Sequence, residues 1–329
     1  MTSSPQVFDD SGRRSPTPEI DLFSQTGMVQ SADKGFTGLV WFFALTSAAI
    51  LFWITFIVFK DAQPSIQEFG IPFIWSKDWD NIEENYGALP FIYGTVVSSL
   101  LALLFAIPLG LAVAILTSEN FLPTWLRSPL AFLVELIAAI PSVIVGLWGI
   151  FTFIPFLQPI QVWLYARFSW VPLFSTEPFG FGMLAAGLVL AAMILPTIAA
   201  ISRDVMLSVP KDLRSASMSL GATRWETIWR ILLPTAASGI LGAVILALGR
   251  ALGETMAVTM VIGNSIQISP SLLAPGYTIP AVLANQFPEA LSELQIGSLM
   301  YLALILFVIT FFVNAIAVLL VEALSRHEE

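Results

Sequence analysis

The residues of this chain whose types and spacing suggest chemistry are Arg250 and Glu254, two opposite charges in the apolar segment LGRALGETMAV. On a continuous helix, residues four apart share one face, so the two are predicted to form an ion pair. They follow Pro234 by 16 and 20 residues, which places them ~24–30 Å along a helix that enters a bilayer at Pro234. Inserting an arginine into the bilayer at that depth costs roughly 3 kcal/mol of free energy. Because buried ion pairs are rarely net stabilisers, this placement favours a functional role over a structural one.

The chemistry expected of this pair is recognition of an oxyanion. A planar guanidinium matches phosphate or carboxylate oxygens with two parallel hydrogen bonds. Glu254 would hold the empty guanidinium in place and then accept a proton shared with the anion. The pair is therefore predicted to prefer protonated phosphate over sulfate, which carries no proton. Gly249 and Gly253, also four apart, are expected to allow close helix packing.

The composition decides what kind of molecule positions these residues. Of 329 residues, 57% are apolar and only 11% are charged, whereas a soluble protein carries about 25% charged residues. The mean hydropathy is +0.83, so an integral membrane protein is expected. The sequence contains no cysteine and a single histidine, His327, which excludes disulfides, thiolate metal sites and multi-histidine metal centres. The net charge of −9 argues against a nucleic-acid partner.

The apolar stretches predict an all-α membrane protein. A crossing helix needs about 20 mostly apolar residues, and the backbone must satisfy its own hydrogen bonds in lipid. The alternation of period two that a membrane barrel requires is missing from the sequence. Six transmembrane helices are expected, at about 37–59, 90–117, 129–155, 180–202, 233–262 and 297–321.

The distribution of basic residues predicts the orientation. Six spans place both termini on one side of the membrane, together with ten of the fourteen lysines and arginines. Three lie on the other side, Lys60, Lys77 and Arg167, and Arg250 lies inside a span. Both termini are therefore expected in the cytoplasm. The long outer loops at 60–87 and 263–294 either anchor the chain at the membrane interface through aromatic residues or form a docking surface for an external partner. The composition of these loops does not separate the two alternatives.

The segment 203–232, RDVMLSVPKDLRSASMSLGATRWETIWRIL, carries five basic residues on the cytoplasmic side. Pro210 suits a helix start, and Ser208 or Asp212 is expected to cap it. Gly221 predicts a bend, after which Trp225 opens a second amphipathic helix. An amphipathic helix lying in the membrane interface is the alternative, but it does not account for the spacing of the proline and the glycine. The sequence has no Gly-Lys dipeptide and hence no phosphate-binding loop of the usual kind.

The stretch from Ser215 to Pro234 resembles the EAA-x3-G-x9-I-x-LP signature of ABC importer permeases. The Gly–Ile–Leu–Pro part matches in spacing, whereas Ser, Ala and Ser stand in the EAA positions. In that family the loop forms a coupling helix that lies in a groove of a cytoplasmic ATPase. The resemblance implies that the coupling residues are Arg214, Ser215, Ala216, Ser217, Leu220, Gly221, Ala222 and Trp225.

Residues 249–264, 135–151 and 304–316 further resemble the phosphate-specific ABC permeases of the PstC type. The resemblance implies a type I ABC importer permease with the MetI-like fold in a bacterial inner membrane. It also implies a PstA-like sister permease, a PstB-like ATPase dimer that holds ATP and Mg²⁺, and a PstS-like binding protein outside the cell. The chain itself is expected to bind no cofactor or metal and to hydrolyse no ATP.

The expected organisation follows from the spans and the resemblance. A disordered cytoplasmic tail occupies residues 1–35, and the first transmembrane helix with its outer loop occupies 36–89. The permease domain, with the coupling loop 203–232, occupies 90–322, and a second cytoplasmic tail occupies 323–329.

By resemblance, Arg250 and Glu254 lie on the translocation path, and Thr255 and Ser142 are further candidates. Ser142 follows the helix-breaking Pro141 and is expected either to offer a donor to a cavity or to bond back to its own helix. Glu135 fits both a buried partner and a residue at the cytoplasmic rim. Three other functions stay open: a permease for another oxyanion such as sulfate or molybdate, a carrier driven by an ion gradient, and a membrane interaction subunit without transport.

Overall fold

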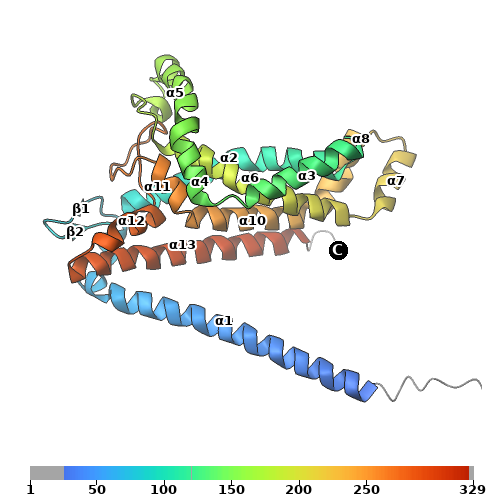
Figure 1. Cartoon of the computed structure of the whole chain (residues 1–329), viewed down its shortest axis with the longest axis horizontal. Helices are drawn as coiled ribbons and strands as arrows, with labels where there is room; N and C mark the ends of the chain where they lie inside the picture. The colour runs from blue at the N-terminus through green and yellow to red at the C-terminus, as the bar shows by residue number, and fades with distance from the viewer. Residues whose placement is uncertain (1–25, 120, 326–329) are drawn as a thin grey trace, which may run out of the picture. The chain divides into compact units, whose positions relative to one another are not determined.

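A computed structural model describes residues 26–119 and 121–325 (Figure 1). The chain divides into two compact units, residues 1–57 and 58–329, and each is described by itself. The described part of the first unit belongs to helix α1 (Thr26–Phe69), which contains the predicted span 37–59. Because α1 begins at Thr26, residues 26–35 are helical, and the prediction of a disordered tail is wrong for them. The remainder of that predicted tail, 1–25, lies outside the described residues.

The second unit is built almost entirely from helices. Its elements after the end of α1 are β1 (Trp79–Asp80), β2 (Asn85–Tyr86), α2 (Leu89–Ser118), α3 (Thr124–Ala138), α4 (Ser142–Trp148), α5 (Ile154–Phe168), α6 (Met183–Ser208), α7 (Lys211–Ser219), α8 (Arg224–Thr227), α9 (Leu233–Thr235), α10 (Ala237–Gly253), α11 (Met256–Val261), α12 (Ile279–Gln286) and α13 (Glu293–Ser325). In the described chain, five helices are long and apolar enough to cross a membrane. The count rises to six if the bent pair Arg224–Thr235 and Ala237–Gly253 forms one span.

The prediction of a third span at 129–155 is wrong. Helix α3 ends at Ala138, and a new helical segment, which runs from Ser142 to Phe168, is the stretch able to cross a membrane. Pro141 explains the break, because proline donates no backbone hydrogen bond and disfavours helical geometry at Ile140 before it. Pro141 adopts an extended ψ of 138° at the start of α4.

The predicted span 233–262 is likewise not one helix. The chain bends by 69° between Thr235 and Ala237, and α10 then ends at Gly253. Glu254 adopts an extended conformation with ψ 125°. Its side chain accepts the backbone N–H of Ala257 at 3.4 Å, so it satisfies one of the free donors in the first turn of α11. The spans predicted at 90–117 and 297–321 fall within α2 and α13, and the span predicted at 180–202 overlaps α6, which begins and ends a few residues later.

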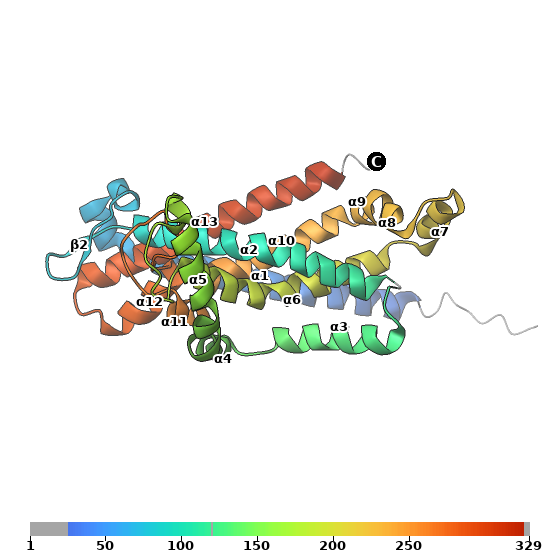
Figure 2. The same cartoon turned by 90° about the horizontal axis from the view of Figure 1, so that it is seen from above.

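Helix α6 is the centre of the second unit and packs against α2, α3 and α10 (Figure 2). Small residues permit this close contact. A Cβ on Gly110 of α2 would lie 2.9 Å from the side chain of Ile198, and a Cβ on Gly187 of α6 would lie 2.7 Å from Leu101. The apolar core therefore depends on the close packing of α2 against α6, two helices that run parallel to each other.

The segments 60–87 and 263–294, which were predicted as outer loops, pack together at one end of the unit, where β1 and β2 pair antiparallel. Trp79 and Tyr86 are buried there, and the indole N–H of Trp79 donates to Oε1 of Gln286 at 2.8 Å. Burial raises the pKa of the Tyr86 hydroxyl. Trp79 is thus a core residue, and neither interface anchoring nor docking describes it. Trp75, at 70% exposure, stays compatible with both alternatives.

Candidate functional site

Arg250 lies on a groove formed by α6, α10 and α13. The groove has a volume of about 660 Å³. It is lined by Thr197, Gly242, Ile245, Leu246, Gly249, Arg250 and Asn314. Nη1 of Arg250 lies 3.4 Å from Oγ1 of Thr197, and the guanidinium is exposed. Among these described lining residues Arg250 alone is charged, so the groove presents one cation on a largely apolar wall.

The predicted ion pair between Arg250 and Glu254 is wrong. Because α10 ends at Gly253, the two residues do not share the face of one continuous helix. Within the described part of the chain, the ion pairs of 4.0 Å or less join other residues. Glu254 instead accepts the backbone N–H of Ala257 in the first turn of α11. The guanidinium of Arg250 therefore faces the groove without the carboxylate of Glu254 beside it. The predicted sharing of a proton between Glu254 and an anion bound to Arg250 requires that contact, which the structure does not have.

The remaining pathway candidates do not line this groove. The hydroxyl of Thr255 donates to the backbone oxygen of Gly253 at 3.2 Å. Ser142 lies in the first turn of α4, which packs against α11, where a Cβ on Gly146 would lie 2.4 Å from the sulfur of Met260. The assignment of Thr255, Ser142 and Glu254 to a transport pathway stays a prediction.

Sequence reasoning missed Thr197 and Asn314, which the fold brings beside Arg250. A signal existed for each of them. Thr197 follows Pro196 inside an apolar span, and Asn314 is the only amide side chain between residues 296 and 321. A polar residue within a membrane helix is expected to face a partner or a water-filled cavity.

Glu135 is exposed rather than buried, with 60% of its side chain accessible. Its Oε1 lies 3.9 Å from Nη1 of Arg203 on α6. The alternative of a buried partner is therefore wrong for the described chain, and the position at the cytoplasmic rim stays a prediction.

The segment 203–232 lies at the end of the second unit opposite the β1–β2 hairpin (Figures 1 and 2). It forms α7, a turn and α8, as the proline and glycine spacing predicts. Gly221 has a φ of +89°, and its N–H donates to the carbonyl of Met218 while that of Ala222 donates to Ser217. These two bonds form a Schellman motif, which ends a helix at a residue in the left-handed region and so favours glycine there.

The start of α8 is fixed by a capping box that the sequence analysis missed, although the spacing of Thr223 and Glu226 is typical of one. The backbone N–H of Glu226 donates to the Thr223 hydroxyl at 3.3 Å, and the carboxylate accepts the Thr223 N–H at 2.8 Å. The backbone and hydroxyl donors of Thr223 lower the pKa of Glu226. The predicted caps of α7 are wrong, because the N-cap residue is Pro210, no side chain caps the helix, and Ser208 donates to Val205 instead.

Most of the predicted coupling residues are exposed. This group comprises Ser215, Ala216, Leu220, Gly221 and Trp225, with Leu220 at 90% and Trp225 at 57% exposure. Ser217 and Ala222 are half-buried.

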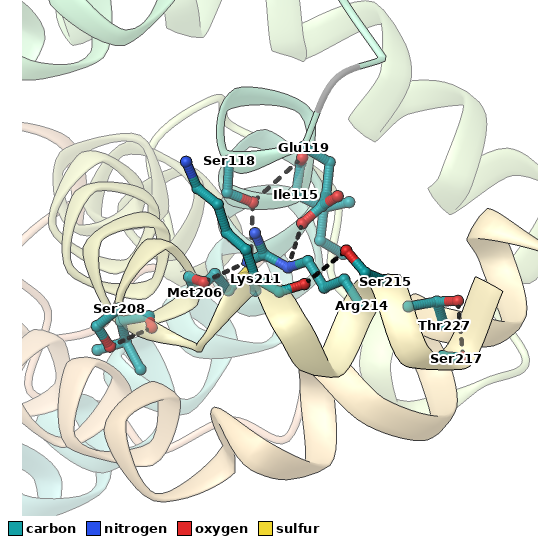
Figure 3. A network of polar contacts seen from close by, with 11 residues as sticks. Ile115, Ser118, Glu119, Met206, Ser208, Lys211, Arg214, Ser215, Ser217 and Thr227 are labelled. Carbon is teal, nitrogen blue, oxygen red and sulfur yellow. Dashed lines mark hydrogen bonds and ion pairs between the residues drawn. The ribbon is translucent and has the colours of Figure 1, made fainter. Parts of the chain in front are cut away.

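Arg214 differs from this group, because it turns into the protein (Figure 3). Its Nε lies 3.3 Å from Oε1 of Glu119, and Nη2 donates to the backbone oxygen of Met206 at 2.6 Å. In this geometry Arg214 is therefore not placed to contact an ATPase directly.

The chain is similar to known proteins in sequence and in fold. The family model described as "Binding-protein-dependent transport system inner membrane component" matches residues 106–327, which include the groove and the segment 203–232. The chain belongs to this family. The permease is thus a multi-pass inner membrane subunit of an ABC importer.

Individual relatives refine the comparison. The phosphate transport system permease protein PstC of Pasteurella multocida is 46% identical over 269 residues, which cover 80% of this permease and 83% of that protein. The PstC protein of Haemophilus influenzae is 41% identical over 315 residues, covering 94% and 98%. The fold matches a bacterial ABC transporter involved in the import of alginate with a TM-score of 0.53, at 20% identity and coverage of 88% and 98%. The predicted MetI-like fold and the PstC-type resemblance are confirmed.

Proposed function

We propose that the permease forms half of the pathway of an ATP-driven importer of inorganic phosphate. The observation that carries the proposal is Arg250, the single charge among the described residues that line the groove between α6, α10 and α13. A guanidinium on an apolar wall offers the donors that an oxyanion needs while it loses its water. Thr197, beside Arg250, and Asn314 add polar groups at the same place. The names of the relatives support phosphate as the anion over sulfate or molybdate.

The proposed assembly has two permeases and a separate source of energy. A PstA-like sister subunit would close the groove, a PstB-like ATPase dimer with its ATP and Mg²⁺ would lie on the cytoplasmic side, and a PstS-like protein would deliver phosphate from outside. This chain would bind no cofactor and hydrolyse no ATP. The excess of basic residues in the predicted inner loops supports cytoplasmic termini.

The exposed surface of α7 and the turn after it fits the contact with the ATPase. Leu213, Met218 and Leu220 present apolar area there, at 43%, 47% and 90% exposure. An apolar helix face surrounded by charge is suited to docking in a groove of another protein. Closure of the ATPase dimer would then move α7 and rock the helix bundles as rigid bodies, which exposes Arg250 to the two sides in turn.

Phosphate uptake into proteoliposomes that contain the assembled importer, its binding protein and internal ATP tests the proposal. Arg250→Gln should lower uptake about 10- to 100-fold, because a hydrogen bond to a charged group contributes about 1.5–3 kcal/mol. Arg167→Gln, at an exposed arginine in the last turn of α5, is the matched control and should keep wild-type uptake.

Two further arms separate the alternatives. Excess sulfate should not compete with phosphate, whereas competition would favour a permease for another oxyanion. A protonophore should leave ATP-driven uptake intact, and collapse of uptake would favour an ion-gradient carrier. Normal uptake by Arg250→Gln would refute the assigned role of the groove.

A further inference from the structure

One charged contact in the coupling segment points into the permease rather than out of it. Arg214 on α7 and Glu119 at the end of α2 have only 14% and 20% of their side chains exposed, and their Nε and Oε1 atoms lie 3.3 Å apart. Nη2 of the same arginine donates to the backbone oxygen of Met206 at 2.6 Å. Figure 3 shows the guanidinium between the Glu119 carboxylate, with which it forms an ion pair, and the Met206 oxygen, to which it donates.

The position of this guanidinium has a physical reason. Met206 belongs to the last turn of α6, whose final carbonyls have no partner within the helix. Glu119 is the residue directly after α2, and its own N–H donates to Ile115 at 3.0 Å. A cation that lies at the C-terminal ends of two helices also complements both helix dipoles. Arg214 therefore joins three segments, α7, α2 and α6, through one planar group.

Other polar side chains of α7 do not make this connection. Ser215 and Ser219 bond to carbonyls within α7 itself. Ser217 lies 3.1 Å from the hydroxyl of Thr227, which links α7 only to α8.

The link continues along a rigid element to the groove. Thr197, whose hydroxyl lies 3.4 Å from Arg250, is nine residues before Met206 on α6. At 1.5 Å per residue this separation is about 14 Å of continuous helix. Because Arg214 holds α7 to the end of α6, a displacement of α7 moves α6 as well. The displacement thus reaches the wall of the groove without passing through a flexible loop.

We propose that Arg214 and Glu119 are positioning residues, which make α7 move together with α2 and α6 so that the motion of the ATPase reaches the groove. The inference rests on the proposed function. Without the pair, α7 still docks through its exposed apolar face and the ATPase still turns over, but α6 no longer follows. The expected defect is therefore loss of coupling rather than loss of assembly.

The experiment measures phosphate imported per ATP hydrolysed by the complete importer in proteoliposomes. Glu119→Gln removes the charge of the ion pair but keeps the size of the side chain, and Arg214→Lys keeps the charge but loses the planar guanidinium that reaches both Glu119 and the Met206 oxygen. Both variants should lower the ratio at least fivefold while ATP hydrolysis stays above half of the wild-type rate. Glu177→Gln and Arg167→Lys, the same changes at exposed residues outside the segment, should leave the ratio unchanged.

A covalent rescue distinguishes positioning from a structural role. The sequence contains no cysteine, so the double variant Glu119→Cys with Arg214→Cys carries only the two new thiols. It should be uncoupled when reduced and should recover at least half of the wild-type ratio after reaction with a short bis-maleimide.

Two results would overturn the inference. The first is a ratio that stays unchanged in Glu119→Gln and Arg214→Lys, including the case in which uptake and ATP hydrolysis fall in proportion. The second is a lowered ratio in the double cysteine variant that does not recover on cross-linking. Failure of the proposed function is distinct from both, since wild-type importer would then take up no phosphate.

Discussion

The close approach of α2 to the segment 263–294 makes Gly94 a sensitive test of the structure. A Cβ at Gly94 would lie 2.0 Å from the backbone oxygen of Tyr277, against an ordinary contact of 3.4–4 Å. The obstacle is backbone and cannot rotate away. It is also held in place, because the N–H of Ile279 donates to the hydroxyl of Thr95 at 2.9 Å. Gly94→Ala must therefore push the loop away from α2.

The size of the effect follows from three contributions. Overpacking costs about 1–3 kcal/mol, and loss of the bond between Ile279 and Thr95 costs about 1 kcal/mol. Replacing glycine by alanine inside a helix returns about 1 kcal/mol. Gly94→Ala should thus destabilise the protein by about 1–3 kcal/mol, which lowers the melting temperature by roughly 2–10 °C.

Thermal unfolding of the detergent-purified chain, followed by tryptophan fluorescence, measures this difference. Gly242→Ala is the matched control, because Gly242 lies within α10 and a Cβ there would meet nothing within 4 Å. The control should melt at or slightly above the wild-type temperature, as expected for alanine in an open helical position. Equal melting temperatures for Gly94→Ala and Gly242→Ala would refute the steric argument.

Three further predictions concern the turn, the capping box and the core. Gly221→Ala should cost about 1–2 kcal/mol because of its left-handed φ, and Gly221→Asn should cost less, as measured by the protease resistance of the 203–232 segment. The hydrogen bonds from Thr223 lower the pKa of Glu226, so they stabilise the folded loop at any pH above the pKa of that carboxyl in the unfolded chain. This stabilisation is lost as the pH falls through the lowered pKa of the folded state. An NMR titration of the carboxyl that places the pKa of Glu226 at or above its ordinary value would contradict this. Ile194→Ala, at a fully buried side chain, should destabilise by about 2–5 kcal/mol, whereas Ile316→Ala, at 57% exposure, should change the melting temperature little.

The sequence alone determined the features that depend on chain-local physics. The long apolar runs predicted α2, α6 and α13, because a segment in lipid must satisfy its own backbone. The spacing of Pro210 and Gly221 predicted the helix, bend and helix of 203–232, since proline starts a helix readily and glycine accepts a left-handed φ. Arg250 stood out as a charge in an apolar run, and the structure places it at a groove.

Tertiary structure decided where those elements break and what their polar side chains meet. Hydropathy does not register a break, because Ile140 and Pro141 interrupt an apolar run without adding charge. The separation of Arg250 from Glu254 likewise depended on the end of α10, which no periodicity marks. The contacts of Arg250 with Thr197 and of Arg214 with Glu119 join residues 53 and 95 positions apart in the sequence. Such pairs form only when packed helices bring distant segments together, and for that reason spacing along the chain could not predict them.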